Sequence, residues 1–162
     1  VFACNVIGVN KGTRGKAGGL KGLFLNDRQI ARAEHFCGTG LFGTFAGGYD
    51  FSACETAQIA PVSEATIGKA VIYSTVDGTQ PQAYEIAIAK VDANDRDNKN
   101  FVIKVTDEAL IEETGGIVQG MSGSPILQNG KLIGAVTHVF LNDPTRGYGI
   151  SIERMMAGER ER

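Results

Sequence analysis

The stretch GGIVQGMSGSPILQNGKLIGAVTHV, residues 115–139, places a glycine-framed serine directly before two short apolar runs. Glycine lacks a Cβ, so Gly120 and Gly123 let the backbone turn and point neighbouring N–H groups into one cavity. A serine in such a cavity becomes a nucleophile when a base takes its proton and donors stabilise the oxyanion. The pattern predicts a nucleophile loop around Ser122, although a plain glycine-rich turn before a strand fits the same letters.

Short apolar runs separated by turn residues extend outward from this stretch along most of the chain. The 22 glycines divide it into pieces rich in Val, Ile and aromatic residues, which is typical of strands. An Asp-Gly pair in VDGT and an Asn-Gly pair in QNGK favour two-residue hairpins, and short turns imply antiparallel pairing. An all-β sandwich or barrel is therefore expected. The predicted strands span residues 6–10, 21–25, 69–76, 83–91, 101–106, 124–128 and 131–141.

One segment has helical character. TDEALIEETGG, residues 106–116, offers Thr106 as an N-cap, acids in its first turn and two glycines as a stop. The charged tail ERMMAGERER, residues 153–162, is expected to be a frayed helix or an artificial or truncated end.

Composition excludes several classes of partner. The 162 residues carry 16 Lys and Arg against 18 Asp and Glu, a net charge of −2 with no basic block, so no nucleic-acid partner is expected. No apolar run approaches the roughly 20 residues of a spanning helix, so the chain itself is expected to make no membrane contact. The three cysteines, Cys4, Cys37 and Cys54, match no zinc spacing, and no metal or cofactor is predicted.

The run GGIVQGMSGSPILQNGKLIGAVTHVFLNDPTRGYGI, residues 115–150, closely resembles the SpoIVB family of sporulation serine peptidases. The likeness extends upstream and covers most of the chain. It implies a trypsin-like double β-barrel whose N-terminal barrel is incomplete here. The implied units are the remainder of the N-terminal barrel at 1–64, a C-terminal barrel at 65–152 carrying the nucleophile loop, and the tail at 153–162.

The resemblance also implies a site. It makes Ser122 the nucleophile, Asp107 the catalytic acid, and the N–H groups of Gly120 and Ser122 the oxyanion hole. On the residues alone, Asp107 is equally well explained as a helix N-cap. The family's histidine falls upstream of Val1, so this chain alone is expected to be inactive, and His138 is expected on the cleft wall.

The function implied is that of a serine endopeptidase that cleaves a regulatory protein during sporulation signalling. The implied place is the space between the forespore and mother-cell membranes, and the partner is a protein or peptide substrate. Two alternatives stay open on the residues: a peptidase-like module that binds peptides by strand addition without cutting them, and an unrelated acyl-group hydrolase. A Gly-His segment in the gene upstream of Val1 would separate the peptidase from the binding module.

Overall fold

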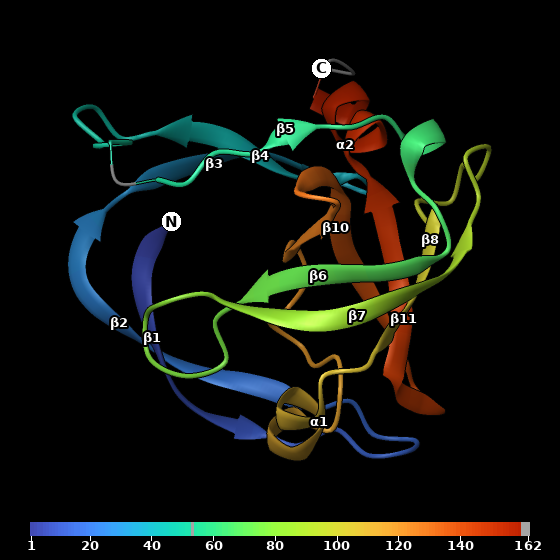
Figure 1. The fold of residues 1–162 in the computed structure, drawn as a ribbon. Helices are drawn as coiled ribbons and strands as arrows, with labels where there is room; N and C mark the ends of the chain where they lie inside the picture. The colour runs from blue at the N-terminus through green and yellow to red at the C-terminus, as the bar shows by residue number, and fades with distance from the viewer. Residues whose placement is uncertain (53, 160–162) are drawn as a thin grey trace.

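The protein, described by a computed structural model over residues 1–52 and 54–159, is built mostly from β-strands (Figure 1). The elements in chain order are β1 (Phe2–Asn10), β2 (Gly19–Gln29), β3 (Ala31–Cys37), β4 (Gly40–Phe45), β5 (Gln58–Ile59), η1 (Val62–Glu64), β6 (Gly68–Ser74), β7 (Gln82–Val91), β8 (Phe101–Val105), α1 (Glu108–Thr114), β9 (Pro125–Gln128), β10 (Lys131–Phe140), β11 (Asp143–Ser151) and α2 (Ile152–Glu159).

A closed barrel forms the C-terminal part. Its strands follow the order β11-β8-β7-β6-β9-β10, and pairing of β10 with β11 closes the ring. The two-residue strand β5 adds to β10 in parallel. Alternation explains the core: on β7 the side chains of Ile86 and Ile88 point inward, and on β8 those of Phe101, Ile103 and Val105 do so, each at most 1% exposed. This core fixes the barrel that carries residues 115–139.

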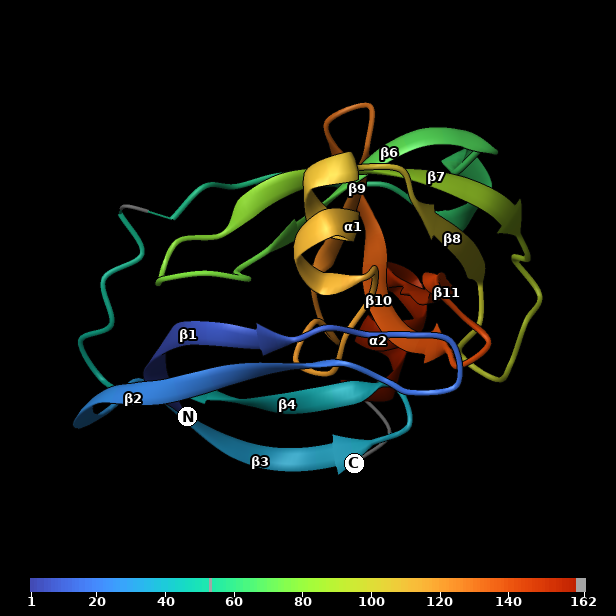
Figure 2. The ribbon, with the colours of Figure 1, turned by 90° about the horizontal axis from the view of Figure 1, so that it is seen from below.

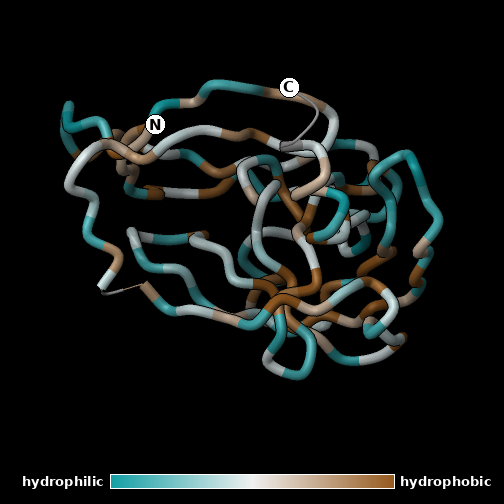
Figure 3. The backbone as a smooth tube through the Cα atoms, turned by 90° about the horizontal axis from the view of Figure 1, so that it is seen from above, coloured by the Kyte–Doolittle hydropathy of each residue, from teal (hydrophilic) through white to brown (hydrophobic). Residues whose placement is uncertain are grey.

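The N-terminal part consists of two hairpins that do not close into a barrel within the described residues. Strand β1 pairs with β2, and β3 pairs with β4, each as a separate two-stranded sheet. Figure 2 shows these four strands as a layer beside the barrel. Phe24 is 76% exposed and Phe36 81% exposed, so this layer presents large apolar side chains to solvent. By contrast, apolar segments gather inside the barrel (Figure 3).

Several backbone hydrogen bonds attach the β1–β2 hairpin to the barrel. Val6 exchanges both its N–H and its C=O with Gly78, at 2.8 and 2.9 Å. The N–H of Gly12 donates to the carbonyl of Thr114 at 2.8 Å. The N–H of Leu20 donates to the carbonyl of Gln119 at 2.9 Å, directly before Gly120. The hairpin thus holds the segment that leads into the glycine-framed serine.

Two local expectations are wrong. The N-cap of α1 is Asp107 and not Thr106: the Asp107 side chain accepts from the N–H of Leu110, and the helix begins at Glu108. The segment VDGT does not form a two-residue hairpin: β6 ends at Ser74, β7 begins at Gln82, and Gly78 in the connection pairs with Val6. The Asn-Gly turn is confirmed: Asn129 and Gly130 both have positive φ, as the tight turn between β9 and β10 requires.

The tail carries the second helix. Residues 152–159 form α2, and the remainder of the predicted tail, 160–162, lies outside the described residues. Neither α1 nor α2, the α-helices within the described ranges, has the length and apolar character needed to cross a bilayer.

Candidate functional site

The glycine-framed segment folds as a tight loop over a buried methionine. Gly120 has φ of 102° and Gly123 has φ of 91°, conformations that favour glycine. Between them, Met121 is fully buried and its N–H donates to the carbonyl of Val118 at 3.1 Å. The N–H of Ser124 in turn donates to the carbonyl of Met121 at 3.0 Å. Met121 therefore pins the loop to the core, and the adjacent Ser122 lies on the outside.

The loop is also fastened to β10. The N–H of Gly123 donates to the carbonyl of Val136 at 2.8 Å, and the N–H of Val136 donates to the carbonyl of Ser124 at 2.9 Å. The hydroxyl of Ser122 donates to the carbonyl of Thr137 at 2.8 Å. Ser122 is exposed, so its Oγ is held in place by one hydrogen bond and stays open to a reactant.

Two backbone donors of the loop are unused. Within the described part of the chain, the N–H groups of Gly120 and Ser122 donate to no acceptor. Both N–H groups are therefore available to an anion that approaches the loop, because no existing hydrogen bond has to break first.

Ser122 lies in a hollow of about 510 Å³ between the barrel and the N-terminal layer. Its floor is formed by the loop residues Gly120, Ser122 and Ser124. One wall comes from the β1–β2 hairpin, and the other comes from the end of β6 with the connection that follows it. The wall residues are Cys4, Val6, Leu20 and Gly22 on the hairpin, and Tyr73, Ser74, Thr75, Thr79 and Pro81 on the barrel.

The second predicted catalytic residue, Asp107, lies at the start of α1 and does not line this hollow. One carboxylate oxygen accepts from the N–H of Leu110 at 2.9 Å and the other from the N–H of Glu85 on β7 at 3.3 Å. Asp107 is half-buried. Its charge affects Tyr84 on β7: burial of the phenol raises the pKa of Tyr84, and the nearby carboxylates of Glu113 and Asp107 raise that pKa further. The structure therefore shows Asp107 as a helix cap that also ties α1 to β7.

The two histidines also lie outside the hollow. His138 is exposed on β10 opposite Tyr148 of β11, one residue beyond the Thr137 carbonyl that receives the Ser122 hydroxyl. His35 lies on β3, where its ring stacks on Phe42 with centroids 6.2 Å apart. Of the predicted site residues, the hollow brings together Gly120 and Ser122, and it includes neither Asp107 nor His138.

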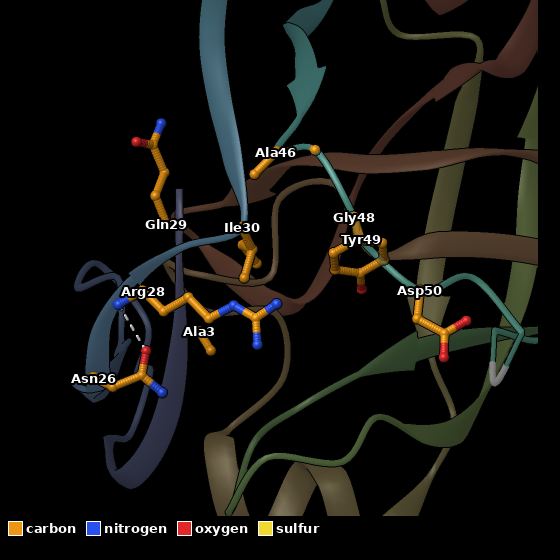
Figure 4. Close-up of a pocket in the computed structure, with 10 residues that line it drawn as sticks. Ala3, Asn26, Arg28, Gln29, Ile30, Ala46, Gly48, Tyr49 and Asp50 are labelled. Carbon is orange, nitrogen blue, oxygen red and sulfur yellow. Dashed lines mark hydrogen bonds between the residues drawn. The ribbon is translucent and has the colours of Figure 1, made fainter.

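A second hollow, of about 400 Å³, lies within the N-terminal layer (Figure 4). Arg28 lines it, and the backbone N–H of that residue donates to the side-chain oxygen of Asn26 at 2.8 Å. Asp50 lines the same hollow, and its pKa is lowered by hydrogen bonds from the backbone N–H and the hydroxyl of Ser52. None of the predicted site residues contributes to it.

Several residues around Ser122 were absent from the sequence-based prediction. The Thr137 carbonyl is a backbone group, and any residue at that position would supply it. Val6 and Leu20 reach the hollow from more than 90 positions upstream, through the bonds of their hairpin with Gly78 and Gln119. Only a sequence pattern that showed the pairing of residues far apart in the chain could have predicted that Val6 and Leu20 line the hollow.

Comparisons with known proteins agree with this architecture. A family model described as SpoIVB peptidase S55 matches residues 1–156. A crystal structure of Rv3671c from M. tuberculosis H37Rv, a serine-to-alanine mutant in an inactive form, superposes with a TM-score of 0.55 at 14% sequence identity. The match covers 89% of this chain and 68% of that chain. No curated protein matches. The predicted all-β, trypsin-like barrel architecture is confirmed, and within the described residues the four N-terminal strands form two hairpins and no closed barrel.

Proposed function

Because the chain belongs to the SpoIVB peptidase S55 family, we propose that it is a serine endopeptidase domain that cleaves a regulatory protein during sporulation signalling. The observation that carries this proposal is the loop at Ser122. It presents an exposed hydroxyl and two free backbone N–H groups beside a hollow between the barrel and the N-terminal layer.

In this mechanism, Ser122 Oγ attacks the carbonyl carbon of the scissile peptide bond. The proton must leave Oγ, so the hydrogen bond to the Thr137 carbonyl breaks and a histidine upstream of Val1 takes the proton. The carbonyl oxygen that becomes negative accepts hydrogen bonds from the N–H groups of Gly120 and Ser122. The histidine then gives its proton to the leaving amine, and water hydrolyses the acyl-serine.

Asp107 is proposed as the acid that orients and stabilises the protonated histidine. Its carboxylate already accepts two backbone N–H groups, which keep it fixed at the start of α1. The bond from the Leu110 N–H also caps the helix, so the experiment on Asp107 separates the capping role from the proposed catalytic role.

The proposed setting follows from the family. The substrate is a protein segment between the forespore and mother-cell membranes. Residues 65–152 are proposed as the unit that carries the nucleophile, and residues 1–64 as the remainder of the N-terminal barrel that forms the facing wall.

The test uses the full-length protein and two serine variants. Ser122→Ala removes the nucleophile, whereas Ser63→Ala removes an exposed hydroxyl from η1, away from the hollow. We expect a fluorophosphonate probe to label the wild type and Ser63→Ala, and peptide cleavage by Ser122→Ala to fall by about three orders of magnitude or more. Cleavage that survives Ser122→Ala would refute the assignment.

A non-catalytic peptide-binding module is the second candidate, favoured by one observation: neither histidine of the described residues lines the hollow. This candidate predicts peptide binding without turnover and no labelling of Ser122 in the full-length protein. Labelling and turnover together would exclude it.

A further inference from the structure

We infer that the hollow beside Ser122 selects a substrate whose side chain next to the scissile bond is apolar and uncharged. The inference rests on the proposed function, since it names the substrate class of that site. The occupant is an extended peptide with an aliphatic or aromatic residue at a position flanking the cleaved bond.

The first observation is the chemistry of the walls. None of the twelve lining residues is Asp, Glu, Lys, Arg or His. Val6 and Leu20 supply apolar surface from the hairpin, and Tyr73 and Pro81 supply it from the barrel side. Two charged residues lie within two positions of the walls in sequence, Lys21 and Asp77, and neither lines the hollow.

The polar groups that remain are neutral. Hydroxyls of serine and threonine, such as that of Thr79, donate or accept a hydrogen bond but neutralise no charge. A charged side chain in this hollow would lose part of its hydration without an ion partner, which is strongly unfavourable. An apolar side chain gains from the same burial. A hollow of about 510 Å³ lies in the size range of small-ligand sites, so a Leu or Phe side chain fits.

The second observation concerns the backbone of β6. Strand β9 pairs with β6 only at Val71 and Ile72. On that side, no strand of the described residues pairs with β6 at Tyr73 or Ser74, although both line the hollow. An extended peptide can add to such an open stretch of strand edge, and strand addition directs alternate side chains into one pocket. The open edge therefore favours an extended segment as the occupant.

The experiment measures cleavage of peptides that differ at one position by the full-length protein. Leu, Phe, Ala, Asp and Lys are placed in turn on each side of the scissile bond. At one of the two positions we expect kcat/KM for Leu or Phe to exceed that for Asp or Lys by about 100-fold or more, with Ala between them. A wild-type preference for Asp or Lys at both positions, or no preference at either, would overturn the inference.

Charge placed on a wall gives a second, independent test. In Val6→Asp and in Thr79→Asp, the second at an exposed turn that tolerates a polar residue, we expect the ratio of Lys to Leu cleavage to rise about 10-fold or more. Ile7→Asp is the matched control: Ile7 neighbours Val6, is 55% exposed and does not line the hollow, so its ratio should not change. A ratio unchanged in both wall variants, or changed equally in Ile7→Asp, would contradict the placement of the side chain.

Binding separates this inference from the proposed function. Ser122→Ala keeps the walls intact, and its affinity for fluorescent peptides of the same series is measured by polarisation. If the wild type neither cleaves nor reacts with the probe, the proposed function fails. Ser122→Ala would then still show tighter binding of Leu and Phe peptides if the inference is right, and equal or tighter binding of charged peptides if it is wrong.

Discussion

The hydroxyl of Ser122 donates to the main-chain carbonyl of Thr137 at 2.8 Å, a bond that joins the glycine-framed loop to the neighbouring strand of the barrel. Since a carbonyl cannot take a proton, this bond positions the oxygen but does not activate it. Ser122→Ala should therefore cost only one exposed hydrogen bond, about 0.5–1.5 kcal/mol in the free energy of unfolding by urea titration. A loss beyond about 3 kcal/mol would mean that loss of activity in this variant reports unfolding.

Asp107 allows its two roles to be separated. Asp107→Ala removes the N-cap acceptor of Leu110 N–H and should lower the free energy of unfolding by about 0.5–2 kcal/mol. Asp107→Asn retains one oxygen that can cap the helix but loses the acceptor of the Glu85 N–H, so its loss of stability should be smaller than that of Asp107→Ala. If Asp107 orients the histidine, both variants lose most peptide cleavage, because asparagine carries no charge. Full cleavage in Asp107→Asn would leave the residue with a capping role alone.

The hairpin bonds around Gln119 lead to a third prediction. The carbonyl of Gly18 accepts the Gln119 N–H at 3.0 Å, and a Cβ at position 18 would run into the backbone of Asn10 and Gly12. Gly18→Ala should therefore lower the free energy of unfolding by about 1–3 kcal/mol, and peptide cleavage should fall because Gln119 precedes the loop. Gly8→Ala, with no atom within 4 Å of the added Cβ, should stay within about 0.5 kcal/mol of wild type. Equal effects in the two variants would refute the role of this contact.

Much of the barrel could be predicted from the sequence, because β7 and β8 alternate between buried and exposed positions. Strand β11 was missed for a physical reason. Glycine is depleted in strands, but Gly147 and Gly149 permit close approach of the neighbouring strands: a Cβ on Gly147 would run into the backbone carbonyl of His138, and one on Gly149 would lie 2.7 Å from the side chain of Ile126. Strands β3 and β4 were missed because both are largely exposed, so burial imposes no sustained alternation of apolar and polar residues on their sequences.

The site could be predicted only where its residues lie close together in the sequence. Gly120 and Ser122 share a loop, so their proximity follows from a few neighbouring letters. The opposite wall depends on the pairing of Leu20 with Gln119, a contact between residues almost 100 positions apart. The cap geometry of Asp107 was an open alternative on the residues alone, because the same acid suits a helix start and a catalytic role.

The phenol of Tyr84 should make stability fall at alkaline pH. Burial first, and then the carboxylates of Glu113 and Asp107, raise its pKa above the ordinary 10.0 in the folded chain. Below about pH 10 the phenol is protonated in both the folded and the unfolded chain, so its full contribution to the free energy of unfolding is present. As the pH rises from about 10 through the folded pKa, the unfolded chain releases its proton first and the free energy of unfolding decreases. Tyr84→Phe should reduce this alkaline slope in urea titrations, with Tyr49→Phe as the control for loss of a phenol. A slope unchanged by Tyr84→Phe would contradict the assignment.

Met121 should be the strongest single contribution of the loop to stability. Its side chain is fully buried beneath Ser122, and its sulfur accepts from the N–H of Val118 at 3.4 Å. Met121→Ala removes that packing and leaves a cavity, so urea titration should show a loss of about 2–5 kcal/mol. Met121→Leu keeps the volume but lacks the sulfur acceptor, and its loss should stay below about 1.5 kcal/mol. Met156→Ala, at a methionine that is 42% exposed on α2, should cost far less than Met121→Ala. If Met121→Ala unfolds at the same urea concentration as Met156→Ala, the loop is held by its bonds to β10 and Leu20 and not by its buried side chain.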